Sequence, residues 1–160
     1  MNHIEMMQLS ERVALQSVCK RAQVGAVVRF AEPVEEVEGI RVRAVTGHNH
    51  NIDPHNWLSG NRCCEGEDGK TLPTVIHAED SALRSAKGYT SGAVLYVTRQ
   101  PCIACAKLIV DAGIHAVYYR DLDDKTDGLE YLLANSVQVD GGWITGQVAE
   151  SWAERNGVAG

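Results

Sequence analysis

The chain has 160 residues, and 44% of them are hydrophobic, which is enough for one compact domain with a substantial core. It contains no apolar run of about 18 residues or more, so no part of it is expected to span a membrane. The formal net charge of -6 argues against a protein that grips nucleic acid through a basic face. The segment Met1-Asn2-His3-Ile4-Glu5 lacks the features of a secretory signal, so a cytoplasmic location is expected.

The first half of the chain predicts one amphipathic helix followed by two strands, over residues 4–18, 24–28 and 40–46. Between the two strands, the segment 30–39 contains Pro33 and four glutamates, and it is expected to be an acidic, solvated hairpin loop. Residues 47–73 are polar and show little periodicity. A loop of this length inside a compact domain is usually functional.

The second half of the chain alternates helices with strands. Helices are expected from His77, from Cys102 and around Leu129, and strands over residues 93–97, 115–119 and 137–139. This alternation predicts an α/β fold, a three-layer α/β/α sandwich. The first two strands should form an antiparallel hairpin, and the later ones should lie parallel through right-handed crossovers. Residues 1–160 are expected to form a single domain.

One pattern carries most of the chemical information: His77-Ala78-Glu79, followed by Pro101-Cys102-Ile103-Ala104-Cys105. It has the order of residues that zinc-dependent nucleobase deaminases use. An imidazole and two thiolates hold zinc while leaving a fourth position for water. Glu79 is not a ligand in this pattern, and a carboxylate there can move protons during the reaction.

The spacing of the pattern indicates how the ligands meet. Pro101 suits the first position of a helix, and Cys102 and Cys105 then fall three residues apart on one face of its first turn. The positive end of the helix dipole favours thiolates there. A lone Cys-x-x-Cys could equally be a redox pair or half of a structural zinc knuckle. The combination with His77 and Glu79 favours a catalytic zinc.

Residues 19–139 resemble the cytidine deaminase superfamily, and most of all the deoxycytidylate (dCMP) deaminases. The likeness rests on residues 19–28, on the helix 101–114 and on the long insert before His77. The resemblance implies that His77, Cys102 and Cys105 bind Zn²⁺ and that Glu79 is the general acid/base. It further implies substrate contacts from Asn49 and Ala78, a five-stranded mixed sheet and a homo-oligomer, a hexamer or smaller.

The chain departs from the family pattern at three points, which leave the reaction intact and the choice of nucleotide open. The segment Gly47-His48-Asn49-His50 lacks a tyrosine and a second glycine of the family pattern. Ser81 stands where the family has an asparagine, and the segment 120–124 lacks the family's tyrosine. Deamination of dCMP to dUMP is the leading expectation, with a small-molecule partner rather than nucleic acid. A tRNA adenosine deaminase is one alternative. A riboflavin-pathway or guanine-type deaminase is another, suggested by Ala82-Leu83-Arg84, and a zinc-stabilised binding module is a third.

The remaining cysteines and cations have less specific meanings. Five cysteines cannot pair evenly, and two are wanted as thiolates, so a disulfide framework is not expected. Cys19, Cys63 and Cys64 could hold a second metal, completed by His50 or His55, or could be ordinary reduced thiols. Three cations could contact a phosphate or simply be solvated: Lys20, Arg21 and Arg120.

Overall fold

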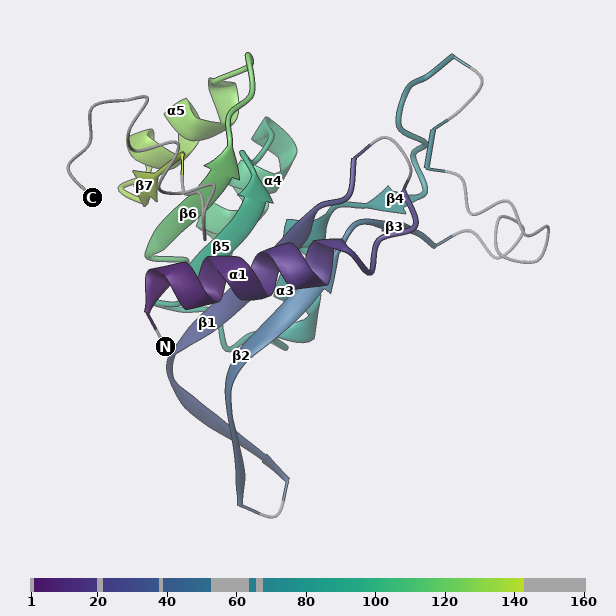
Figure 1. Ribbon diagram of the computed structural model, residues 1–160. Coiled ribbons are helices and arrows are strands. Elements are labelled where there is room, and N and C mark those ends of the chain that lie inside the picture. Colours follow the sequence, from purple (N-terminus) through teal and green to yellow (C-terminus); the bar gives the residue numbers. More distant parts are fainter. Residues whose placement is uncertain (1, 20–21, 38, 53–63, 66–67, 143–160) are drawn as a thin grey trace.

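The computed structural model of the protein describes residues 2–19, 22–37, 39–52, 64–65 and 68–142. A five-stranded mixed sheet, in the order β2-β1-β5-β6-β7, forms its centre (Figure 1). Its strands are β1 (Gly25–Val37), β2 (Ile40–His48), β5 (Val94–Arg99), β6 (Ala116–Asp121) and β7 (Gln138–Asp140). Two short strands, β3 (His50–Asn51) and β4 (Val75–Ile76), pair in a second sheet.

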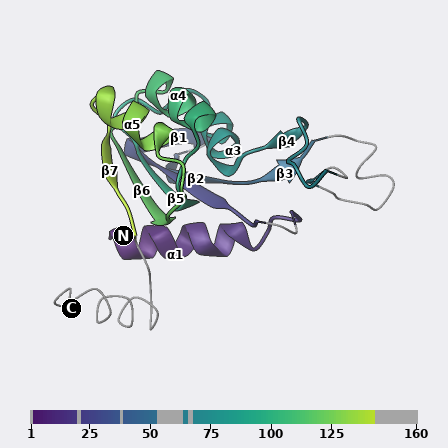
Figure 2. The ribbon, with the colours of Figure 1, turned by 90° about the horizontal axis from the view of Figure 1, so that it is seen from above.

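Helices cover both faces of the large sheet, as the sequence predicted. Figure 2 shows α1 (His3–Ala14) on one face, with α3 (Ala78–Ser85), α4 (Ile103–Asp111) and α5 (Asp127–Ala134) on the other. The predicted antiparallel β1–β2 pair and the parallel pairs β5–β6 and β6–β7 are confirmed. Among the described helices, none is long and apolar enough to cross a bilayer. Residues 143–160, with Trp143 and Trp152, lie outside the described part, so the extent of the single domain stays a prediction.

The core lies on both sides of the central strand β5, because successive side chains of a strand point to opposite faces. Leu95 and Val97, both fully buried, belong to the larger cluster, which includes residues of α3, α4 and α5. Tyr96 between them packs with Met6 of α1 on the other face. Burying an aliphatic side chain of this size contributes roughly 1.5–3 kcal/mol. The sheet that carries the site is therefore anchored from both faces.

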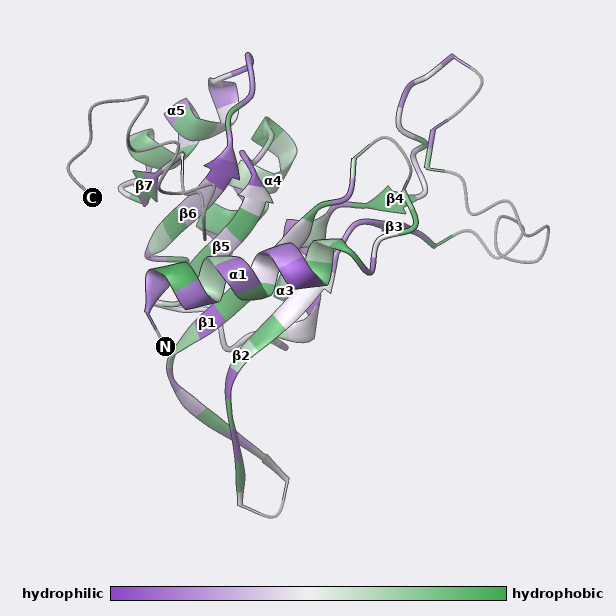
Figure 3. Cartoon of the chain, in the orientation of Figure 1, coloured by the Kyte–Doolittle hydropathy of each residue, from purple (hydrophilic) through white to green (hydrophobic). Residues whose placement is uncertain are grey.

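The hairpin predicted over residues 30–39 is present, but most of this segment is strand and not loop. Here β1 continues to Val37 and pairs with β2, forming a ribbon that projects from the body of the protein (Figure 1). Hydrophobic and hydrophilic residues alternate at the start of β2, over residues 40–44 (Figure 3), which is the strand pattern. The register shifts between Arg29 and Val34, and Pro33 falls inside this irregularity, where the missing N–H breaks no regular pairing.

Strand β2 and helix α3 approach each other closely at Gly47. A Cβ atom built on Gly47 would lie 2.3 Å from the backbone nitrogen of Ala82 in α3, well inside contact distance. Only glycine therefore allows this approach. The contact seats the helix that begins at His77 directly on the sheet.

Candidate active site and metal centre

Two helix N-termini meet at one point of the structure. His77 is the N-cap residue of α3, and Cys102 is the N-cap residue of α4. Cys105 is the third residue of α4, and the side chains at an N-cap and at the third helical position are neighbours. The expected convergence of the three residues is confirmed. Pro101 is not the first helical residue as predicted, because α4 begins at Ile103.

The three side chains offer a donor set that fits zinc. The Nδ1 atom of His77 lies 3.6 Å from the Sγ of Cys102 and 3.3 Å from the Sγ of Cys105. All three donor atoms lie within 4.8 Å of one another. Tetrahedral zinc with bonds of about 2.0–2.3 Å requires donor atoms roughly 3.5–3.8 Å apart, so little movement would be needed. Three ligands leave one coordination position for water.

The cluster itself favours a thiolate at Cys102. Hydrogen bonds from the Cys105 and His77 side chains lower the pKa of Cys102 to about 3. The proton is retained on the partners: the hydrogen bond with Cys102 raises the pKa of Cys105, and a hydrogen bond to Cys102 raises that of His77. The positive ends of two helix dipoles act in the same direction. The surroundings of Cys102 therefore favour the form of this side chain that binds a metal.

Glu79 lies beside this cluster in the first turn of α3. Its side chain is only 5% exposed, and burial raises its pKa to about 7. It is not one of the three clustered donor residues. A buried carboxyl group with a pKa near neutrality is suited to accept and return a proton.

A cavity of about 410 Å³ opens over the cluster, a volume typical of small-molecule sites. His77, Ala78, Glu79 and Cys102 line one part of it. Ala22, Val24 and Asn49 line a second part, and Cys64, Glu65 and Thr71 a third. The two predicted substrate contacts, Asn49 and Ala78, are therefore both at the cavity, although their contact with substrate stays a prediction.

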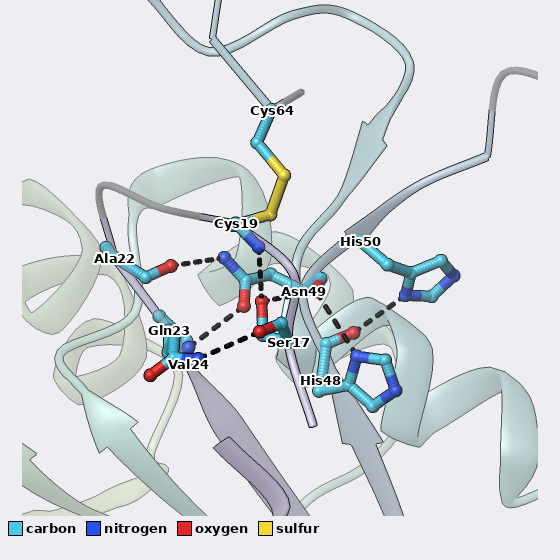
Figure 4. Close-up of a disulfide and its surroundings, with 9 residues drawn as sticks. All are labelled: Ser17, Cys19, Ala22, Gln23, Val24, His48, Asn49, His50 and Cys64. Carbon is cyan, nitrogen blue, oxygen red and sulfur yellow. Dashed lines mark hydrogen bonds between the residues drawn. A yellow bond between two sulfur atoms is a disulfide. The ribbon is translucent and has the colours of Figure 1, made fainter. Parts of the chain in front are cut away.

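Asn49 also has a structural task that the sequence did not reveal. Its side-chain Nδ2 donates to the carbonyl of Ala22 (2.7 Å), and its Oδ1 accepts from the backbone N–H of Val24 (2.9 Å). Its own carbonyl accepts from the hydroxyl of Ser17 (2.8 Å), as Figure 4 shows. Asn49 therefore holds the segment that forms one wall of the cavity.

We expect Asn49→Ala to lower both stability and catalytic efficiency. Losing two partly buried hydrogen bonds should cost about 1–3 kcal/mol, measured as the free energy of unfolding and as kcat/KM. Gln23→Ala is the matched control, since Gln23 bonds to Ser17 from the same segment but does not line the cavity. Parental stability and kinetics in Asn49→Ala would refute this role.

Sequence reasoning missed the cations of the cavity. Arg99 and Lys125 line it, and Arg99 pairs with Asp123 at 3.0 Å. The available signal was topological: Arg99 ends β5 and the segment of Lys125 follows β6, and parallel strands bring such ends to one edge, where α/β proteins bind ligands. Of the predicted cations, Arg120 instead pairs with Glu11 of α1. Lys20 and Arg21 lie outside the described residues, as does His55.

Cys19 and Cys64 are bonded to each other (Figure 4), which neither of the two roles expected for them, a second metal site or reduced thiols, had predicted. Their Cα atoms lie 5.2 Å apart, and both residues are 2% exposed. Bonded sulfurs are not thiolates, so in this state Cys19 and Cys64 cannot serve as ligands of a second metal. Cys63 lies outside the described residues, and the ring of His50 instead contacts the carbonyl of His48. The disulfide connects the Cys64 wall of the cavity to the segment that Asn49 holds.

We expect reduction of this disulfide to destabilise the protein. Its residues are 45 apart, and closing such a loop stabilises by about 4 kcal/mol in the chain-entropy view. Cys64→Ser should therefore lower the midpoint of urea unfolding, and reductant should have little further effect on that variant. Cys63→Ser is the control and should retain the bond. If Cys19 and Cys64 react with a thiol reagent without prior reduction, or if two zinc ions are bound per chain, this assignment fails.

The fold and the donor cluster define a class of protein to which the similarity with known proteins points independently. The cytidine and deoxycytidylate deaminase zinc-binding region matches residues 1–121, so the chain belongs to this family. The crystal structure of the dCMP deaminase from the cyanophage S-TIM5, in complex with dCMP and dUMP, is 37% identical with a TM-score of 0.66, covering 84% of this chain and 92% of the other.

Two curated relatives are also similar to this chain over most of its length. The deoxycytidylate deaminase of Mycobacterium phage D29 is 32% identical over 123 residues, covering 69% of this chain and 88% of the relative. ComE operon protein 2 of Bacillus subtilis is 33% identical over 123 residues, which are 75% of this chain. This chain spans 59% of the length of the Bacillus protein.

Proposed function

We propose that this protein is a zinc-dependent hydrolase that converts dCMP and water to dUMP and ammonia. The observation that carries the proposal is the meeting of the His77, Cys102 and Cys105 donor atoms, within 4.8 Å of one another, beside the buried carboxyl group of Glu79. A structural zinc site has no use for that carboxyl group, so a zinc-stabilised binding module is disfavoured. The dUMP formed would supply thymidylate synthesis.

The reaction divides the work between metal and carboxylate. His77, Cys102 and Cys105 would hold the zinc, which when bound activates water as a nucleophile at neutral pH. Glu79 accepts a proton from the attacking water and delivers it to the ring nitrogen next to C4. Glu79 then accepts the remaining proton of the hydroxyl group added at C4 and transfers it to the amino group, which leaves as ammonia. The C–N bond breaks as the added hydroxyl group becomes the carbonyl group of the product.

A free nucleotide is favoured over the alternative substrates. A protein that binds tRNA needs a basic surface, and this chain has a net charge of -6. The riboflavin-type alternative rested on Ala82-Leu83-Arg84, but Arg84 forms an exposed ion pair with Asp80 and does not line the cavity. The cyanophage relative was crystallised with dCMP and dUMP. Arg99 and Lys125 are cavity cations with the charge that a nucleotide phosphate requires.

The test is ammonia release from a panel of cytosine, adenine and guanine nucleotides, each supplied with and without its 5′-phosphate. We expect dCMP to be the best substrate and deoxycytidine to be much poorer. Preference for a guanine or adenine compound would replace the proposed substrate, and no release from any zinc-loaded sample would contradict the proposed activity. The homo-oligomeric state stays a prediction, to be checked by sedimentation.

A further inference from the structure

The segment between β6 and α5 forms one side of the cavity without being part of a helix or strand. Its residues Asp123 and Lys125 line the cavity, whereas its residues Leu122 and Asp124 do not. Such a segment has many solvent-exposed backbone groups and is free to move unless something fixes it. What fixes it determines the shape of this side of the cavity.

Gln100 supplies that fixation through both ends of its side chain. Its Oε1 accepts from the backbone N–H of Asp123 (3.1 Å), and its Nε2 donates to the backbone carbonyl of Lys125 (2.5 Å). Its backbone N–H donates to the carbonyl of Asp121 (2.9 Å). The side chain is 6% exposed, so water does not compete freely for these bonds. A carboxamide offers the required donor and acceptor at once, and a carboxylate does not.

The same stretch of chain carries a zinc ligand. Gln100 lies two residues before Cys102. The residue that precedes Gln100, Arg99, forms an ion pair with Asp123. Further along, α5 packs against the ligand segment at Gly128. A Cβ atom on Gly128 would lie 2.4 Å from the carbonyl oxygen of Pro101. The cavity wall and the metal-binding helix are therefore held to each other at several points, with Gln100 the most buried polar connection.

We propose that Gln100 is a positioning residue: its carboxamide holds residues 121–125 against the zinc-binding segment, so that Asp123 and Lys125 face the substrate. The kinetic consequence rests on the proposed function, since displacement of residues 121–125 would weaken substrate binding. Gln100 itself lines the cavity, but it is not one of the three donor residues of the metal site. The expected signature is a raised KM with a nearly parental kcat.

Two substitutions separate the contacts. Gln100→Leu keeps the approximate size and removes both hydrogen bonds. Gln100→Glu can still accept from Asp123, but it presents an acceptor to the Lys125 carbonyl and cannot donate to it. Asp124→Asn is the matched control, because Asp124 belongs to the same segment and its exposed side chain does not line the cavity. Zinc content is measured for every variant.

The first readout is amide hydrogen exchange, which needs no substrate. The Asp123 amide should exchange at least about tenfold faster in Gln100→Leu than in the parent, as expected for loss of a buried hydrogen bond. The Ala106 amide, which bonds to the carbonyl of Cys102 inside α4, should not change. In Gln100→Glu the Asp123 amide should stay more protected than in Gln100→Leu.

The second readout is steady-state kinetics with dCMP. KM should rise about tenfold in Gln100→Leu and less in Gln100→Glu, with kcat within about threefold of the parent. If Gln100→Leu shows the same Asp123 amide exchange rate and the same KM as the parent, the proposal is overturned. If Gln100→Leu does not fold, the parent decides: an Asp123 amide that is unprotected in the parent also overturns the proposal. If the parent released no ammonia from dCMP, the proposed function would fail by itself. The exchange of Asp123 would still decide whether Gln100 holds the segment.

Discussion

Replacing Glu79 by Gln is expected to lower kcat by at least about 10³-fold while the protein still folds and binds zinc. The substitution keeps the size of the side chain and much of its hydrogen bonding, but it removes the group that accepts and returns a proton. General acid/base catalysis contributes typically about 10²–10⁴-fold. A carboxylate used in both the attack and the departure of ammonia should lie near the upper end of that range.

The folded state should not suffer from this change. Burial raises the pKa of Glu79 from 4.5 to about 7, so the folded protein prefers the protonated group. The stability that this preference contributes is present below about pH 4.5 and is lost as the pH rises through about 7. At pH 8 the metal-free Gln variant should therefore be at least as stable as the metal-free parent. An activity loss cannot then be ascribed to unfolding.

The measurement is kcat for dCMP at saturating zinc, with the zinc content of each sample determined by elemental analysis. Asp80→Asn is the matched control, since it neutralises the next carboxylate of the same helical turn. Asp80 pairs with Arg84 and does not line the cavity, so this variant should stay within about threefold of the parent. A zinc-loaded Glu79→Gln that turns over within about tenfold of the parent would show that Glu79 is not the proton shuttle.

The donor cluster could be predicted because its geometry is local. The spacing of Cys102 and Cys105 places both at the start of one helix. His77 and Glu79 both lie at the start of another helix. The distance between the two pairs depends on the fold, yet the order of strands and helices restricts it strongly. The local spacing of the residues and the order of strands and helices were therefore sufficient to predict the donor cluster.

The walls of the cavity could not be predicted because they depend on register between distant segments. In the register of the parallel strands β5 and β6, Arg99 lies opposite Asp121. This alignment places Gln100 beside the segment that it binds. Nothing in the sequence around Gln100 identifies that partner. The disulfide presents the same difficulty, since Cys19 and Cys64 are joined across 45 residues of chain. The ribbon was missed for another reason: residues 31–37 contain Pro33 and adjacent glutamates and do not alternate regularly, so the strand there is visible only from its pairing with β2.

Cys102→Ser is expected to abolish both zinc binding and deamination. A thiolate is a strong ligand for zinc, and the hydrogen bonds from Cys105 and His77 lower the pKa of Cys102 to about 3, which favours the form that binds the metal. The serine hydroxyl remains protonated at neutral pH and reaches less far. Since disturbing groups behind a metal ligand already costs about 10–100-fold in affinity, losing the ligand itself should cost more than about 100-fold.

Elemental analysis after dialysis against a weak chelator gives zinc per chain, and ammonia release from dCMP gives activity. The control is Ala104→Ser, which introduces the same hydroxyl one position before Cys105, on an exposed residue outside the donor cluster. This variant should keep one zinc and stay near parental activity, because a single exposed Ala-to-Ser change costs a helix only a few tenths of a kcal/mol (roughly 0.5). Full zinc in Cys102→Ser would remove Cys102 from the ligand set. Lost zinc with retained activity would instead show that hydrolysis at this site does not depend on the metal.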